Sequence, residues 1–492
     1  MSVLIDNNYG CILEYREIDS WGKLYIGSKI VDATFDYYEI ERIDKDSGRD
    51  PHDLKDMIKL IFLASIEKID SSIVIREKAK RDKYYKLFCN KIKPSDRSIR
   101  DYKKIYKAIH HIILKFSLIL AKRLNISSFN HISVDGTIKL ACNSPFNILK
   151  RKDLHLLLKH YMVEELSKKE IKQLRKVAKK FLFDKTISDE RKVEMIYEWH
   201  DKLDLTGQSS IALYDVDARL MKIKDKGQLY KKWAYNIQLA VDTESKLICG
   251  VNVVQNPTDH YQMPAILEQT INNLGIKPSI VSADNIYGTL SNLFYLKEQG
   301  ISARIPTREQ NKEDKENSDD NPYGKDKFFF DEIRDVFICP EKQELTVDGV
   351  YDAPTQKGGF NKKKIVYSNH LACKNCPHKS KCTKAEHRTI TRYVHTLSYE
   401  VEKIIDTPEG KKDYSKRVST VEPPNGTFKR VFKYDFLQTV GLEMVQGYMF
   451  KISAAYNIIR IYNIMFDNKW DIFELGEFIN IVGSKNEEVV FD

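Results

Sequence analysis

Short β-type runs separated by long helical stretches constrain the fold of this chain more than any other feature of its sequence. The runs are 131–135, 278–284, and a pair at 235–241 and 247–255 that is joined by a short polar turn. Such a pair predicts an antiparallel hairpin, and a short apolar run such as 278–284 is typical of a buried strand. Strands that alternate with helices in this order favour an α/β fold with a mixed sheet that carries insertions.

The helical stretches differ in character along the chain. Between 48 and 122 the apolar residues recur at helical spacing and are interrupted by polar breaks, which predicts four or five short helices. We interpret this part as an all-α DNA-binding domain, and the pattern alone fits a plain helical bundle equally well. A Lys-rich and Leu-rich helical insertion is expected at 146–205, an amphipathic helix at 261–274 and a further helix at 439–466.

These patterns divide the chain into six parts. In chain order we expect a leader (1–47), the helical domain (48–125), the first part of an α/β core (126–290, with the helical insertion 146–205), an insertion with a cysteine site (291–410), the last part of the core (411–470) and a C-terminal tail (471–492). Residues 310–327 are polar and dense in charge, so they should form an exposed loop.

Composition and charge indicate an intracellular protein that can bind nucleic acid. The N-terminal residues lack the basic start and apolar core of a signal peptide, and apolar runs such as 58–66 are too short to span a bilayer. We therefore expect a cytoplasmic protein without a membrane partner. The net charge is +10, and Lys and Arg gather at 168–180 and 411–430. Such clusters neutralise phosphates, although a well-solvated surface is the plain alternative.

Two aspartates stand at the ends of predicted strands. Asp135, in S-V-D-G-T, closes the first run before a glycine turn, and Asp284, in S-A-D-N-I-Y-G, closes the last run. Phosphodiester chemistry with two divalent ions needs rigidly held carboxylates, because hard cations such as Mg²⁺ prefer oxygen ligands. The rival acids are Asp215 and Asp217, expected in a turn or salt bridge, Asp242 in the solvated hairpin turn, and Asp259, which could lie beside the site.

A third acidic context lies near the C-terminus, in Y-S-K-R-V-S-T-V-E-P-P-N-G-T-F-K. Together with the two aspartate contexts it resembles the DDE transposases of bacterial insertion sequences (the IS-four-like superfamily), in the group with a Y-R-E-K motif. The motif falls on Tyr414, Arg417, Glu422 and Lys429, and Asn425 stands where an aromatic residue is common. The resemblance extends over most of the chain, including the helical domain and the hairpin.

This resemblance implies a ribonuclease-H-like core in which Asp135, Asp284 and Glu422 bind two Mg²⁺ (or Mn²⁺) ions. It implies a DNA transposase that cleaves transposon ends and joins the 3′-hydroxyl to target DNA, acting as a homodimer on terminal inverted repeats in the nucleoid. Arg417 and Lys429 match positions that contact DNA, and Tyr414 could stack on a base or pack inside the core. Two alternatives stay open: a domesticated or inactive transposase that only binds DNA, and a nuclease of the same fold without strand transfer.

Four of the eight cysteines lie in one segment, as C-P followed by C-K-N-C-P-H-K-S-K-C. A C-x-x-C pair presents two thiolates to one tetrahedral ion, and two further cysteines would complete the site. We therefore expect a structural Zn²⁺ site at Cys339, Cys373, Cys376 and Cys382, with His378 and His387 as alternative ligands. The segment 340–390 has few large aliphatic residues, so we expect the ion to replace a hydrophobic core there.

Overall fold

The computed structural model describes residues 15–41, 52–143, 147–225, 228–306, 322–331, 333–353, 362–428 and 437–484. The chain forms two compact units, the first comprising Met1–Ser279 and Lys416–Asp492 and the second Ile280–Ser415. Within the described residues, no helix combines the length and the apolar character needed to cross a membrane. Because the two units are separate bodies, each is described by itself below.

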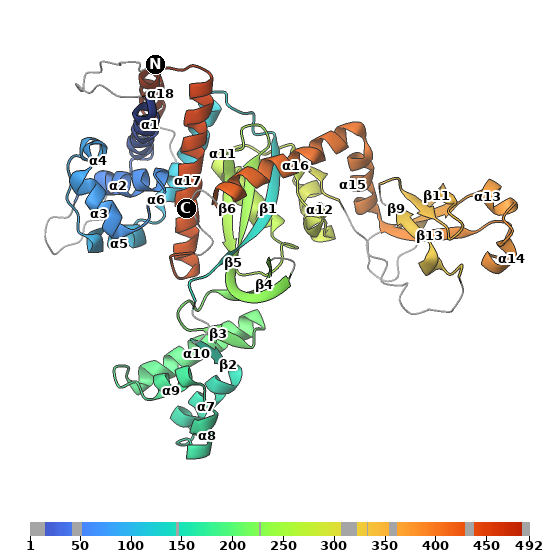
Figure 1. The fold of residues 1–492 in the computed structure, drawn as a ribbon, viewed down its shortest axis with the longest axis horizontal. Coiled ribbons are helices and arrows are strands. Elements are labelled where there is room, and N and C mark those ends of the chain that lie inside the picture. Colours follow the sequence, from blue (N-terminus) through green and yellow to red (C-terminus); the bar gives the residue numbers. More distant parts are fainter. Residues whose placement is uncertain are drawn as a thin grey trace. The chain divides into compact units, whose positions relative to one another are not determined.

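Helices from both ends of the chain form one bundle in the first unit (Figure 1). Its members are α1 (Tyr15–Tyr37), α2 (Leu54–Ile66), α3 (Ser72–Arg81), α4 (Lys83–Phe88), α5 (Asp96–Ile105), α6 (Ile109–Arg123), α17 (Leu442–Asp467) and α18 (Ile472–Gly483). Five helices between 54 and 123 match the predicted number. The segments expected as a leader and a tail hold α1 and α18, which pack against each other.

The contact between α1 and α18 is close because α18 offers glycines to it. A Cβ on Gly476 would lie 2.6 Å from Tyr25 Oη, and one on Gly483 would lie 2.7 Å from Ala33 Cβ. A side chain at Gly483 would meet the Ala33 backbone and displace α1, whereas one at Gly476 would displace the Tyr25 ring. The N-terminal helices also pack on α17, so the helical module at 48–125 shares its core with the C-terminal helices.

An antiparallel sheet forms the centre of the first unit. Its strands run in the order β4 (Arg219–Asp225), β5 (Gln228–Asp242) and β1 (His131–Leu140), and β6 (Ile248–Val254) also pairs with β5. The β5–β6 pair confirms the predicted hairpin, and α11 (Met263–Leu274) confirms the predicted amphipathic helix. The expectation of a turn after Asp135 is wrong, because β1 continues past Gly136 and pairs with β5 as far as Leu140 and Ala234.

Side-chain amides satisfy backbone groups of β6 that no neighbouring strand reaches. Asn457 of α17 accepts from the Ile248 N–H at 2.8 Å and donates to the Ile248 carbonyl at 2.9 Å. Gln446 of α17 likewise accepts from Val253 N at 2.7 Å and donates to the Val251 carbonyl at 2.8 Å. These amides take the place of a further strand and close the edge of the sheet against other chains.

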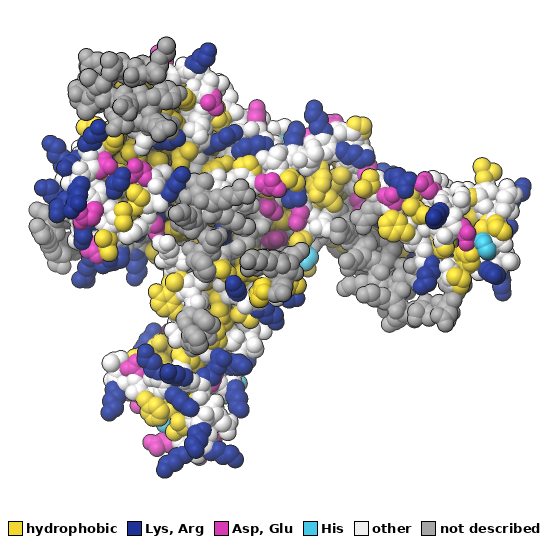
Figure 2. Space-filling view, in the orientation of Figure 1, with side chains coloured by type: hydrophobic (Ala, Val, Ile, Leu, Met, Phe, Trp, Pro, Cys, Tyr) yellow, Lys and Arg dark blue, Asp and Glu magenta, His cyan; other side chains and the backbone are white. Residues whose placement is uncertain are grey.

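A helical insertion leaves the sheet between β1 and β4. It consists of β2 (Ile148–Lys150), α7 (Arg151–Met162), α8 (Lys168–Gln173), α9 (Lys176–Leu182), α10 (Asp189–Thr206) and β3 (Ser210–Ala212). The small β2–β3 ladder closes the base of the insertion. The helices enclose their own core, which includes Leu157, Ile196 and Trp199. Figure 2 shows Lys and Arg side chains on the visible surface of the insertion, whereas Lys192 of α10 is buried.

The second unit contains parallel and antiparallel pairing. Strands β7 (Ile280–Ser282) and β8 (Ser302–Arg304) are parallel and are joined by α12 (Leu290–Glu298). A separate antiparallel sheet follows in the order β13 (Thr389–His395), β12 (Lys362–Ser368), β11 (Glu344–Ala353), β10 (Val336–Ile338) and β9 (Phe329–Asp331). The chain thus combines both kinds of strand pairing with many helices, as expected for an α/β protein.

The cysteine-bearing segment builds a small hydrophobic core, contrary to expectation. Its members are Phe328, Phe337, Leu345, Ile365, Tyr367, Ile390 and Val394, with Cys339 and Cys382 packed against them. These residues alternate with Lys and Thr along the strands, so the apolar content is low while one face of the sheet is apolar. Two short helices follow β12, α13 (His370–Lys374) with Cys373 and α14 (Lys379–Cys382) with Cys382, and Cys376 lies between them.

Candidate functional site

Asp135 lies in the middle of β1 and is opposite Leu239 of β5. Its neighbour Gly136 lies on the other face of the sheet, because successive strand residues alternate. A Cβ on Gly136 would approach Asp259 Oδ1 to 2.5 Å. The glycine is therefore needed here because the Asp259 carboxylate lies close to the backbone, and not because the chain turns. Asp259 is therefore on the face opposite to Asp135, where Gln238 Nε2 donates to it at 2.6 Å.

The helix α16 (Pro408–Gly426) lies across the Asp135 face of the sheet. Arg417 Nη1 is 3.9 Å from Asp135 Oδ1, and Asn425 Nδ2 is 3.3 Å from Asp135 Oδ2. The two helix residues are eight apart, which places them within about 80° of each other around the helix axis. Thr420 accepts a hydrogen bond from Lys246 Nζ at 3.1 Å and ties the helix to the hairpin turn.

The other two predicted acids belong to different units, Glu422 to the first and Asp284 to the second. Glu422 is exposed, because α16 buries its neighbours Thr420, Val421 and Pro424. Asp284 belongs to the second unit, where it follows β7, is half-buried and accepts from Ile286 N at 2.9 Å as the cap of a short 3₁₀ helix.

The three residues predicted to contact DNA differ in burial and in location. Arg417 is partly buried, with its side chain 18% exposed, and faces Asp135 as described above. Tyr414 is half-buried on the part of α16 that belongs to the second unit. Lys429 lies outside the described residues. Both interpretations of Tyr414, that it stacks on a base and that it packs inside the core, stay predictions.

The rival acids have structural partners. Asp215 is buried, accepts from Tyr235 Oη at 2.7 Å and from Gly441 N at 3.3 Å, and burial raises its pKa. Asp217 accepts from Lys202 Nζ and from Leu442 N, so both aspartates anchor the start of α17. Asp242 is buried rather than solvated, since Ser245 N and Oγ each donate to it at 2.6 Å.

The four predicted zinc ligands line one small apolar pocket of the second unit. Cys339 follows β10 and its Sγ accepts from Gln343 N at 3.3 Å, while Cys373 and Cys376 flank the end of α13 and Cys382 ends α14. Burial raises the pKa of Cys382, and the other three cysteines raise it further. Among the described residues, no three of these sulfur atoms lie within 4.8 Å of one another, so the cysteines share a pocket without forming a closed ligand set. Their donor chemistry fits a cation such as Zn²⁺.

The two histidines considered as alternative zinc ligands have other neighbours. His378 Nε2 is 3.7 Å from Glu341 Oε1. His387 stacks on His370, with ring centroids 3.7 Å apart, and these two rings gather with Asp348. No spacing in the sequence indicated this second group, because its members are separated by 22 and 17 positions and share no motif.

A family model matches one segment of the chain. Residues 338–462, about a quarter of the chain, match the family described as a transposase DDE domain. The match includes α16 and most of α17. A search of curated proteins found no match. One solved structure that the chain resembles is a piggyBac transposase in a synaptic complex with hairpin DNA, at 10% identity and a TM-score of 0.32, over 94% of this chain and 78% of that one.

Proposed function

We propose that the chain is a DDE transposase that cleaves transposon ends and joins the 3′-hydroxyl to target DNA. The observation that carries the proposal is the contact of α16 with Asp135. That helix carries Tyr414, Arg417 and Glu422 of the Y-R-E-K motif, and it lies inside the segment matched to a transposase DDE domain. A strand carboxylate beneath a helix with a guanidinium and an amide is suited to a phosphodiester substrate. We also propose the ribonuclease-H-like core and the Y-R-E-K grouping.

Asp135, Asp284 and Glu422 would hold two Mg²⁺ ions, which would activate the attacking oxygen and stabilise the leaving oxygen. The donor chemistry fits hard cations, because each residue offers carboxylate oxygens and Asp135 remains 24% exposed. Arg417 would form a bidentate contact with a DNA phosphate, and Asn425 would orient the Asp135 carboxylate. Tyr414 and Lys429 would extend the contact along the DNA.

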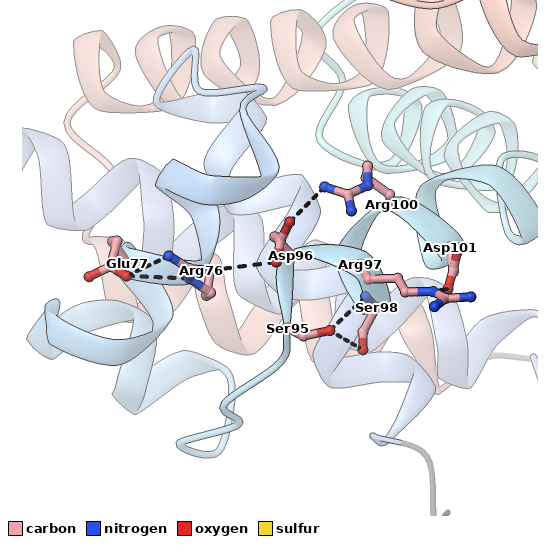
Figure 3. Close-up of polar contacts among 8 residues, drawn as sticks. All are labelled: Arg76, Glu77, Ser95, Asp96, Arg97, Ser98, Arg100 and Asp101. Atoms are coloured by element: carbon pink, nitrogen blue, oxygen red, sulfur yellow. Dashed lines mark hydrogen bonds and ion pairs between the residues drawn. The ribbon is translucent and has the colours of Figure 1, made fainter. Parts of the chain in front are cut away.

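Recognition of the transposon ends would fall to the helical module. Figure 3 shows the start of α5, where Ser95 caps the helix by accepting from Ser98 N at 3.0 Å. Arg97 is 85% exposed at this end, and Arg100 pairs with Asp96 at 2.7 Å. A capped helix with exposed arginines in its first turn can present them to a DNA groove. The protein would act in the nucleoid as a homodimer on two inverted repeats.

A DNA-binding protein that no longer cuts is the second candidate function. The exposed position of Glu422 and the contact of Asn425 with Asp135 favour it, since an amide, and not the third acid, bonds to the first acid. A nuclease without strand transfer is the third possibility. It would cleave the transposon end but would form no product in which that end is joined to target DNA.

The test uses the full chain and a duplex that ends in the inverted repeat flanking the gene, with Mg²⁺ or Mn²⁺. We expect Asp135→Ala, Asp284→Ala and Glu422→Ala each to abolish cleavage while DNA binding persists. Glu443→Gln is the matched control, because Glu443 is an exposed acid paired with Lys107. Binding without cleavage by the unaltered chain would favour the second function. Cleavage without joined products would favour the nuclease, and wild-type cleavage by Asp284→Ala would refute that assignment.

A further inference from the structure

The second unit holds a group of metal-binding side chains apart from the cysteines. Asp348 of β11, His370 of α13 and His387, which precedes β13, offer ligand atoms that all lie within 4.8 Å of one another. Within the parts of the chain that the structure describes, no other group of three such side chains is this close. We propose that these three residues bind one Zn²⁺ ion, separate from any ion held by the cysteines.

The spacing of the donor atoms suits a shared ion. His370 Nε2 lies 3.3 Å from Asp348 Oδ1 and 3.4 Å from Asp348 Oδ2. A tetrahedral Zn²⁺ with bonds of about 2.0–2.2 Å holds neighbouring ligand atoms about 3.4 Å apart. A direct charge-assisted bond between imidazolium and carboxylate would be about 2.7–2.9 Å. The observed distances therefore match two ligands of one ion better than a direct hydrogen bond.

Backbone features hold two of the ligands in place. The register of β11 with β12 shifts between Val347 and Gly349, so Asp348 is the extra residue of a β-bulge. A bulge re-aims the side chain of its extra residue, here toward His370. His370 is the first residue of α13, and Asn369 fixes that helix end by accepting from Ala372 N at 2.9 Å and donating to the Glu344 carbonyl at 2.7 Å.

The third ligand has a nitrogen without a partner. His387 Nδ1 is buried and finds no hydrogen-bond partner among the described residues. An unsatisfied buried polar atom costs about 1–3 kcal/mol, so its occurrence calls for an explanation. The neighbouring Arg388 points toward the cysteines, where its Nη1 donates to the Cys382 carbonyl at 3.3 Å. His387 and Arg388 thus serve two different sites from adjacent positions.

The donor set indicates both the metal and its coordination. Two imidazoles and one carboxylate suit Zn²⁺, while Mg²⁺ avoids imidazole nitrogen. Three protein ligands leave a fourth position for water or an anion. The side chains of His370 and Asp348 are 57% and 41% exposed, so solvent reaches that position. Such an ion would fasten β11, α13 and the start of β13 to one another.

The test uses the full chain, stripped of metal with a chelator and titrated with Co²⁺ and then Zn²⁺. If the cysteines also bind, we expect about two ions per chain. His387→Ala should lower the number by about one and leave the thiolate-to-cobalt charge-transfer bands intact. Cys373→Ser should remove those bands and leave the weak visible bands of a nitrogen and oxygen site. His260→Ala, outside the group, is the control and should change neither.

Two further variants keep the result decisive if His387→Ala misfolds. Asp348→Asn and His370→Gln alter the ligands at exposed positions, and each should weaken Zn²⁺ binding at least tenfold in the Cys373→Ser background. Retention of the site in both variants would overturn the proposal, and so would absence of Zn²⁺ binding by folded Cys373→Ser protein. DNA cleavage plays no part in these readouts, so the outcome is independent of the proposed transposase activity.

Discussion

Replacement of Asn457 should destabilise the sheet of the first unit severely and locally. The side chain is fully buried, and it bonds both the N–H and the carbonyl of Ile248 and also donates to Ser117 Oγ at 3.2 Å. Asn457→Leu keeps a similar volume but leaves the two Ile248 groups buried without partners. Each such group costs about 1–3 kcal/mol, so we expect a loss of about 2–6 kcal/mol. Asn457→Ala should cost more, because it adds a cavity.

Local hydrogen exchange of the full chain is the right assay, because unfolding of a protein with two units is not a single transition. At about 1.4 kcal/mol for each factor of ten, exchange of the β6 amides should accelerate about 30-fold to 20,000-fold. Asn480→Ala, at an exposed position of α18, is the matched control and should leave β6 unchanged. Unaltered β6 exchange in folded Asn457→Leu protein would refute the idea that these amides hold the sheet edge.

Further predictions concern charge and metal. Asp70 contacts Lys451 and Lys103, and these two lysines lower its pKa more strongly than burial raises it. The ionised Asp70 carboxylate therefore stabilises the folded state above pH ~4, and this stabilisation is lost as the pH falls below that value. Asp70→Asn should therefore flatten acid unfolding, and an unchanged acid limb would contradict this. Burial lowers the pKa of Lys103 to about 8, so stability should rise as the pH increases from there to about 10.5, and Lys103→Met should remove that rise. Arg417→Gln should weaken DNA binding and reduce the salt slope by about one, whereas an unchanged slope would mark a structural role. Cys373→Ser should expose α13 and α14 to protease while the antiparallel sheet survives, because that sheet has its own core. Cleavage throughout 328–390 would show that the metal holds the whole segment.

Local pattern was enough for elements that are apolar on one side. The two apolar runs joined by a polar turn predicted the β5–β6 pair, and the apolar stripe of α11 predicted that helix close to its true bounds, whereas β5 begins seven residues before the predicted strand. The helix α1 escaped prediction because it is buried on most sides by α2, α6, α17 and α18, so no polar face marks its period. A helix of this kind is defined by partners that lie at the other end of the chain.

At the candidate site, too, sequence motifs identified single residues but not the contacts between residues that are far apart in the sequence. The motifs singled out Asp135 at a strand end and Arg417 as a DNA contact, and the structure adds that the two side chains lie 3.9 Å apart. Gly136 suggested a turn, because glycine is common in turns, but its real cause is the close approach of Asp259. That approach joins residues 123 positions apart, so no local pattern records it. The grouping of Asp348 with two histidines is hidden for the same reason.

The position of Glu422 follows from the geometry of α16. With about 100° of rotation per residue, Glu422 lies about 140° from Arg417 and about 60° from Asn425 around the axis. The direction that faces Asp135 lies between Arg417 and Asn425, so Glu422 is about a quarter turn away from it. A regular helix cannot bring all three toward the same carboxylate. The next residues, Pro423 and Pro424, have no N–H to bond to the preceding turn, so the helix is weakest immediately beside Glu422. Under the proposed function, engagement of Glu422 with the metal ions would therefore need a local rearrangement of α16 at these prolines.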